Sequence, residues 1–245
     1  MPSCFQYVQM WKAALTPSLA VYNFGMRPVV VLFAKAPVPG RVKTRLAACI
    51  GPPAAAQGHR VFVRDLLERL QLLADSADLE LHTDIPTDAW DDAAVARRLQ
   101  LDSENLGERL WFAGALGLSA GRPQVVIVGS DSPDLPLEHI RALLGSAADV
   151  ALGPADDGGF YAIAMRRADP HMFHGVRWSG PETLAETVRA IERCGLSVEL
   201  GPPWYDVDTV QDLARLAASP LLPPRTARWL LELPGEFRMR PTMEI

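Results

Sequence analysis

The chain has 245 residues, of which 49% are hydrophobic and 22% charged, and its formal net charge is −5. This length is enough for one α/β domain with a sizeable core, and the composition is that of an ordinary globular enzyme. The negative net charge argues against general nucleic-acid binding, so we expect no nucleic-acid partner. The three cysteines lie far apart, at positions 4, 49 and 194, which argues against a disulfide framework or a zinc site and favours a reducing cytoplasm.

Residues 1–25 are predicted to be an N-terminal extension. They are moderately apolar, but polar residues and Pro17 interrupt them, so they match neither a signal peptide nor a membrane span. Met26 stands directly before the first predicted strand, and we interpret it as the natural start of the protein. An amphipathic arm that binds a partner is the alternative.

Strands and helices alternate along the rest of the chain. The apolar runs predict strands at 29–33, 79–82, 125–128, 149–153, 160–165 and 196–200. Helical spacing predicts one helix that starts near 43 and others over 61–73, 181–194 and 210–217. Three more are expected: one after the acidic start of 84–98, one that ends near 118, and one after 224. A capping box of Ser179 and Glu182 is predicted to open the helix over 181–194. This order predicts an α/β fold with three layers (α/β/α) and a mostly parallel sheet, with one antiparallel element that makes it mixed. We expect one domain over 26–220, followed by a helix and tail over 221–245.

The loop after the first strand carries the strongest functional signal. Four cations gather between the strand exit and the start of the next helix, where backbone N–H groups also favour anions. The loop lacks the glycines of a P-loop and of a dinucleotide fingerprint, so it predicts a phosphate site of another kind, with a basic surface loop as the alternative. The predicted phosphate-binding residues are Lys35, Gly40, Arg41, Lys43, Thr44 and Arg45.

Two acidic clusters are candidates for a metal site. Asp131 and Asp134 follow the strand that ends at Val128, where ligands bind in open α/β sheets. Asp208 belongs to a second cluster, Asp206-Val207-Asp208. Because Mg²⁺ and Mn²⁺ take oxygen ligands and bridge to phosphates, we predict one of these ions at Asp131 and Asp208. Helix capping is the alternative for both Asp134 and Asp208.

The segment Asp156-Asp157-Gly158-Gly159 has two compatible interpretations. Paired glycines allow a ligand to approach the backbone, and neighbouring acids can hold sugar hydroxyls, which predicts substrate contacts at Asp157, Gly158 and Gly159. Aspartate and glycine are also the usual residues of a tight hairpin turn.

Four segments, 33–46, 129–135, 153–161 and 204–213, together resemble a known family. They look like the DUF2064 transferases, often labelled radical-SAM/selenodomain-associated transferase 1 or arsenosugar-biosynthesis glycosyltransferase, of the nucleotide-diphospho-sugar transferase (GT-A) superfamily. The resemblance covers the chain from about Arg27 to Ala218. It implies a Rossmann-like GT-A fold with the nucleotide at the carboxyl ends of the early strands, and a base-contacting segment at Gln100 and 106–109, which includes Gly107.

The resemblance leaves the reaction open. Asp131 and Asp134 depart from the Asp-x-Asp metal motif of GT-A glycosyltransferases, and the basic loop is also similar to nucleotidyltransferases of molybdopterin and deazaflavin-cofactor synthesis. We expect a metal-dependent glycosyltransferase that uses a nucleotide-diphosphate sugar and a small-molecule acceptor. Asp131 would hold the metal, and Lys43 and Arg45 would stabilise the leaving diphosphate. Nucleotidyl transfer from a nucleoside triphosphate to a phosphorylated small molecule is the alternative, and a non-catalytic nucleotide-binding protein is a third.

Overall fold

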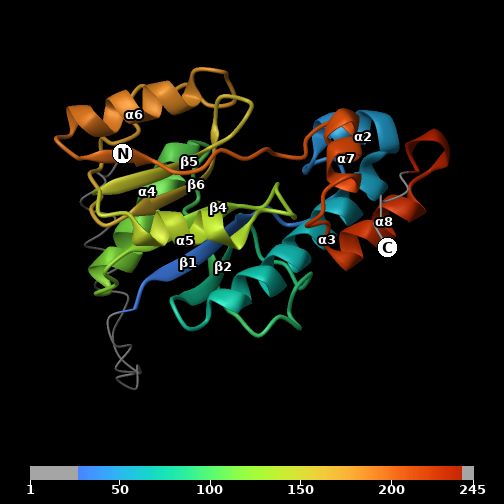
Figure 1. Cartoon of the computed structure of the whole chain (residues 1–245), viewed down its shortest axis with the longest axis horizontal. Coiled ribbons are helices and arrows are strands. Elements are labelled where there is room, and N and C mark those ends of the chain that lie inside the picture. Colours follow the sequence, from blue (N-terminus) through green and yellow to red (C-terminus); the bar gives the residue numbers. More distant parts are fainter. Residues whose placement is uncertain (1–26, 239–245) are drawn as a thin grey trace.

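The computed structural model describes residues 27–238, which form a mixed seven-stranded sheet between two layers of helices (Figure 1). The strands are β1 (Val29–Ala34), β2 (Asp78–Thr83), β3 (Ala96–Leu99), β4 (Val125–Gly129), β5 (Val150–Pro154), β6 (Phe160–Met165) and β7 (Val198–Leu200). Their order in the sheet is β3-β2-β1-β4-β6-β5-β7. Only β6 runs antiparallel to its two neighbours, so the predicted three-layer α/β fold with a mostly parallel, mixed sheet is confirmed.

Helices cover both faces of the sheet. The helices are α2 (Thr44–Ile50), α3 (Pro52–Leu70), α4 (Leu106–Ser119), α5 (Leu137–Gly145), α6 (Thr183–Arg193), α7 (Val210–Ala217) and α8 (Pro224–Glu232). Side chains of α3 and α5 form one hydrophobic core with the sheet, and side chains of α4 and α6 form the other. All six residues of β1 are buried, because this central strand is covered on both sides.

A third core holds the loops that carry the predicted site. Helices α2, α7 and α8 gather around the start of α3, at the right of Figure 1. Leu46 of α2 and Leu213 of α7 are fully buried there, and Trp229 of α8 meets Phe62 of α3 edge-on, with 5.4 Å between the ring centroids. Since α2 follows Lys43 directly and α7 follows the Asp208 loop, this core fixes one segment relative to the other. Helix α8 of the predicted 221–245 segment is part of it.

Two local predictions are wrong. Residues 84–98 form no helix. Instead Trp90 is buried with its Nε1–H on the Arg60 carbonyl at 3.1 Å, and the chain then extends as the edge strand β3. Ser179 does not open α6, because its φ of 62° is unlike that of an N-cap residue and the helix begins after Glu182 without a side-chain cap. A capping box does form at α7, between Thr209 and Asp212.

Some predictions fall on residues outside the described range. The predicted N-terminal extension, 1–25, lies there, and so does the end of the predicted tail, 239–245. Among residues 27–238, no helix combines the length and the apolar character needed to cross a membrane. Cys49 and Cys194 both carry free thiols.

Candidate active site

A cavity of about 630 Å³ lies at the edge of the sheet where β1 and β4 end. Because β1, β2 and β4 are parallel, the segments after their carboxyl ends meet at this edge, and the antiparallel β6 begins there. Three kinds of side chain line the cavity: cations of the first loop, carboxylates, and an aromatic wall. The carboxylates are Glu104, Asp131, Asp206 and Asp208, and the wall is Phe160 and Trp178.

Asp84, directly after β2, holds the first loop in place. Its carboxylate accepts a hydrogen bond from the Ala36 backbone N–H at 2.6 Å and lies 3.5 Å from the Arg41 guanidinium. Gly40 turns the loop at a φ of 82°, where a side chain would be strained. Beyond this turn, the loop residues from Arg41 to Arg45 line the cavity.

Lys43 has a backbone conformation that is rare for a residue with a side chain. It lies directly before α2 with a φ of 47°. Apart from glycines, Ser179 is the one other described residue with a positive φ, and both residues line the cavity. Strained backbone of this kind clusters at functional sites.

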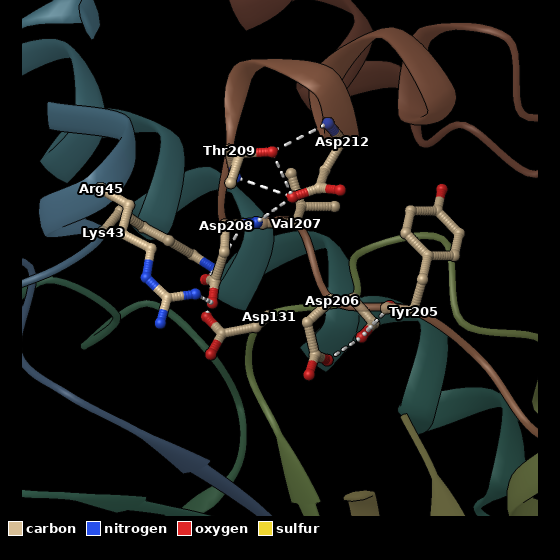
Figure 2. A network of polar contacts seen from close by, with 10 residues as sticks. Lys43, Arg45, Asp131, Tyr205, Asp206, Val207, Asp208, Thr209 and Asp212 are labelled. Atoms are coloured by element: carbon tan, nitrogen blue, oxygen red, sulfur yellow. Dashed lines mark hydrogen bonds and ion pairs between the residues drawn. The ribbon is translucent and has the colours of Figure 1, made fainter. Parts of the chain in front are cut away.

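The Lys43 ammonium lies between two carboxylates, as Figure 2 shows. Its Nζ is 2.5 Å from Oδ1 of Asp131 and 3.1 Å from Oδ1 of Asp208, and it donates to the Val207 carbonyl at 2.7 Å. An ammonium has three donors, so each of them has a partner inside the protein. The Lys43 side chain is 3% exposed, whereas Asp131 and Asp208 expose 45% and 37% of theirs. Arg45 lies 3.8 Å from the other oxygen of Asp208 and is far more exposed than Lys43.

Opposite charges keep Lys43 and Asp131 ionised. Burial lowers the pKa of Lys43, but the charges of Asp131 and Asp208 outweigh burial and leave the pKa above its ordinary value. Burial raises the pKa of Asp131, but the Lys43 ammonium outweighs it and holds the pKa below its usual range. Because the Lys43 side chain is 3% exposed, removing the carboxylates would leave its charge poorly solvated and without a counter-ion.

Asp206 lies next to the cluster and has no ion-pair partner among the described residues. The Ser132 hydroxyl is 2.9 Å from its Oδ1. Burial and the negative charge of Asp131 together raise the pKa of Asp206 to about 7. Asp206 is therefore partly protonated at neutral pH and adds less than a full negative charge beside Asp131.

Asp131 and Asp208 are placed to share one cation, since the Lys43 ammonium already contacts an oxygen of each. Within the described range, no group of three or more His, Cys, Asp or Glu side chains is arranged to hold a metal by itself. Mg²⁺ is commonly bound by one or two carboxylates together with substrate phosphates and water. The donor set therefore fits a divalent ion that binds together with a phosphate chain.

Most of the predicted site residues come together around the cavity. Those that line it are Lys35, Arg41, Lys43, Thr44, Arg45, Asp131 and Asp208. The remaining predicted residues do not line it; they are Gly40, Gly107, Asp157, Gly158 and Gly159. As contacts to a ligand, these five stay predictions.

Gly158 and Gly107 have clear packing roles. The segment around Gly158 is the hairpin turn between β5 and β6, in which Asp157 Oδ1 accepts the Gly159 N–H at 2.9 Å. A side chain on Gly158 would overlap the backbone of Pro181, and a Cβ on Gly107 would lie 3.0 Å from the Trp178 ring. Both glycines thus support the segment that carries the aromatic wall.

Two further residues line the cavity: His59, which the sequence did not single out as a site residue, and Gln100, which lies where the resemblance implies a base-contacting segment. His59 of α3 lines the cavity, and its Nε2–H donates to the Lys35 carbonyl at 2.9 Å, since a carbonyl can only accept. Gln100 donates to the carbonyls of Ala34 and His82 at 3.0 Å each and accepts from Arg109 at 3.0 Å. These contacts join residues that are distant in the chain, so local patterns do not reveal them.

Asp134 neither caps a helix nor faces the cavity. The N-cap of α5 is Pro136, without a side-chain cap. Asp134 is fully buried, and its Oδ2 accepts a hydrogen bond from the Tyr205 hydroxyl at 2.6 Å. Instead of serving as a metal ligand or a helix cap, Asp134 joins the loop after β4 to the segment that carries Asp206 and Asp208.

Comparisons with known proteins agree with this fold and site. The family model described as "Uncharacterized protein conserved in bacteria (DUF2064)" matches residues 65–180. A crystal structure of a candidate nucleotide-diphospho-sugar transferase from Desulfovibrio desulfuricans G20 is 35% identical, with a TM-score of 0.73 over 84% of this chain and 94% of that chain. The 2-phospho-L-lactate guanylyltransferase of Methanocella arvoryzae is 28% identical over 71% of this chain and 74% of its own length.

A cytidylyltransferase from Leptospira borgpetersenii shares the fold at 12% identity, with a TM-score of 0.51 over 90% of this chain and all of that chain. The fold, the cavity and these relatives define the protein as an enzyme of the nucleotide-dependent transferase class. More narrowly, the chain belongs to the DUF2064 family of the nucleotide-diphospho-sugar transferase superfamily.

Proposed function

We propose that the protein is a metal-dependent glycosyltransferase, which moves a sugar from a nucleoside-diphosphate sugar to a small-molecule acceptor. The observation that carries this proposal is the convergence of Asp131 and Asp208 on one cationic centre beside the basic first loop. A diphosphate leaving group carries negative charge that such a centre stabilises. The name of the 35% identical relative supports the same class of donor.

The first loop binds the diphosphate in this proposal. Lys35, Arg41 and Arg45 are exposed at the cavity and supply charged donors to the phosphate oxygens. Asp131 and Asp208 are the residues that would hold Mg²⁺ or Mn²⁺ beside these phosphates. When bound, the ion neutralises the charge that develops on the leaving group.

The aromatic wall of the cavity binds the sugar or the acceptor in this proposal. Phe160 and Trp178 are half-buried and meet edge-on, with 6.2 Å between the ring centroids. Their apolar surface suits the C–H face of a sugar ring, and the nearby turn with Asp157 offers polar groups for hydroxyls.

Nucleotidyl transfer is the second candidate function. A triphosphate carries more charge than a diphosphate, and four cations of one loop line the cavity. The 28% identical relative is a guanylyltransferase. In this reaction a phosphorylated acceptor attacks the nucleotide and releases pyrophosphate, and positioning and charge neutralisation dominate the catalysis.

Product analysis tests the proposal. The protein is incubated with Mg²⁺, a pool of small-molecule metabolites, and either nucleotide sugars or nucleoside triphosphates. Release of a free nucleoside diphosphate from a nucleotide sugar is the expected result. Pyrophosphate release from a triphosphate, with no turnover of any nucleotide sugar, would favour the second candidate instead.

A matched pair of variants links the activity to the cavity. We expect Arg45→Met to lower turnover by about tenfold or more, because it removes a charged donor at the phosphates. Arg141→Met removes another exposed arginine, from α5 and away from the cavity, and should leave turnover unchanged. Equal rates for the two variants would contradict the role of the loop.

A further inference from the structure

Lys43 and the proposed metal ion require the same oxygen atoms. The Lys43 ammonium contacts Oδ1 of Asp131 and Oδ1 of Asp208 at 2.5 and 3.1 Å, and Figure 2 shows the three side chains close together. A divalent cation bound by both carboxylates would occupy this position. Two cations cannot share it, because they would repel each other at contact distance and the Lys43 side chain is only 3% exposed to water.

We propose that the Lys43 ammonium occupies the position of the divalent ion in the free protein. There it neutralises Asp131 and Asp208, and it moves to the phosphates when metal and nucleotide bind. The inference rests on the proposed function, since it assigns the exchange to that site. It adds a competition between a side chain and the metal, and it makes metal binding and phosphate binding mutually dependent.

The hydrogen bonds of Lys43 require this exchange. All three ammonium donors are used by Asp131, Asp208 and the Val207 carbonyl, so none points to a phosphate. Lys43 can bind a phosphate oxygen only after it gives up at least one of these partners. A metal ion on the two carboxylates would replace two of them.

The surroundings allow the side chain to move while the helix behind it stays fixed. Leu46 and Ile50 of α2 are buried in the third core, which anchors the helix. In contrast, Gly40 in the preceding turn has nothing within 4 Å of a Cβ built on it, and Arg41 is exposed. The exchange therefore needs a rearrangement of one side chain and its strained backbone, not of the fold.

Cooperative binding follows from this arrangement. A metal ion alone must displace a lysine that has no new partner, so it binds weakly. A phosphate chain offers the displaced ammonium a new anion, which lowers the cost of displacement. Each ligand thus strengthens the binding of the other by the same factor.

Mn²⁺ binding without nucleotide tests the competition directly. Free Mn²⁺ is measured by electron paramagnetic resonance during titration of the wild type, Lys43→Met and Arg45→Met. We expect Lys43→Met to bind Mn²⁺ about tenfold tighter or more, because the carboxylates lose their internal cation. Arg45→Met removes the same charge from an exposed position and should change the affinity by about twofold at most. Equal affinities for the two variants would overturn the proposal.

Chemical labelling of the wild type keeps the proposal testable if Lys43→Met does not fold. The chain has three lysines, Lys12, Lys35 and Lys43, so mass spectrometry resolves each one after brief acylation. Saturating Mn²⁺ should increase the labelling of Lys43 several-fold, since the ammonium leaves its buried ion pairs. Lys35, exposed on the same loop, is the internal reference and should label equally with and without Mn²⁺. Unchanged labelling of Lys43 at saturating Mn²⁺ would contradict the exchange.

These two measurements separate the inference from the proposed function. Neither uses a nucleotide, an acceptor or turnover. If Mn²⁺ displaces Lys43 but no nucleotide sugar is turned over, the proposed reaction fails and the exchange stands. If nucleotide sugars are turned over with Mg²⁺ while Lys43 stays protected, the exchange fails and the reaction stands.

Discussion

The turn between β5 and β6 depends on a residue without a side chain at Gly158. This glycine has a φ of 89°, and its carbonyl accepts a hydrogen bond from the Leu184 N–H at 2.8 Å. The turn therefore touches the segment from Trp178 to Pro181 that borders the cavity. Because the turn packs closely against the Pro181 backbone, packing alone accounts for a glycine at position 158.

We expect Gly158→Ala to destabilise the protein by about 3 kcal/mol, through backbone strain and overlap with Pro181. Gly121→Ala is the matched control, because Gly121 has a φ of 88° with open space around a Cβ. Gly121→Ala should lower the free energy of unfolding by only about 1 kcal/mol, because it strains the backbone without any overlap. Urea unfolding measures both values, and equal losses would show that the contact with Pro181 is unimportant.

At the scale of elements, the β2–β3 edge of the sheet is held by a buried charge. Glu80 of β2 contacts His82 at 3.0 Å and Arg98 of β3 at 2.8 Å. Burial raises the pKa of Glu80, but hydrogen bonds from His82 and Arg98 outweigh it and lower the pKa to about 2. Gln100 follows β3 and forms part of the cavity wall, so this edge supports the site.

The lowered pKa gives a dependence of stability on pH. Because the pKa of Glu80 is lower in the folded state than the ordinary value of 4.5, its contribution is complete above pH 4.5 and is lost as the pH falls towards 2. The full contribution is about 3 kcal/mol, of which about 2 kcal/mol disappears between pH 7 and pH 3. The difference in unfolding free energy between wild type and Glu80→Gln should narrow by that amount.

Urea unfolding of both proteins at pH 7 and pH 3 measures this difference. Glu138→Gln is the control, because Glu138 is 77% exposed and its contact with Arg141 is weak. The control should stay within about 0.5 kcal/mol of wild type at both pH values. If the difference in unfolding free energy between wild type and Glu80→Gln were the same at both pH values, the lowered pKa of Glu80 would be contradicted.

At the scale of the whole molecule, the sequence predicts the layers and most of the phosphate side of the site. The apolar runs of β1 and β4 and the cations between Lys35 and Arg45 are local patterns, so they can be recognised without a structure. Asp131 was predicted from its place after β4, because the carboxyl ends of parallel strands meet at one edge.

Other features depend on contacts between distant segments. No local pattern indicates that Lys43 lies between Asp131 and Asp208, since 88 and 165 residues separate them in sequence. The helix expected over 84–98 does not form, because Trp90 packs into the core and the residues of β3 pair with β2. His59, Asp206 and the aromatic wall reach the cavity through the same tertiary packing.

The central claim is that the cavity binds the diphosphate of a nucleoside diphosphate through a metal ion at Asp131. Calorimetric titration of wild type and Asp131→Asn with nucleoside diphosphates, with and without Mg²⁺, tests it most directly. Asp75→Asn, an exposed aspartate away from the cavity, is the control. We expect Mg²⁺ to strengthen diphosphate binding by wild type and the control, and Asp131→Asn to bind about tenfold more weakly or worse than wild type when Mg²⁺ is present, with an affinity that Mg²⁺ does not change. Equal affinity and equal Mg²⁺ dependence in wild type and Asp131→Asn would contradict the account.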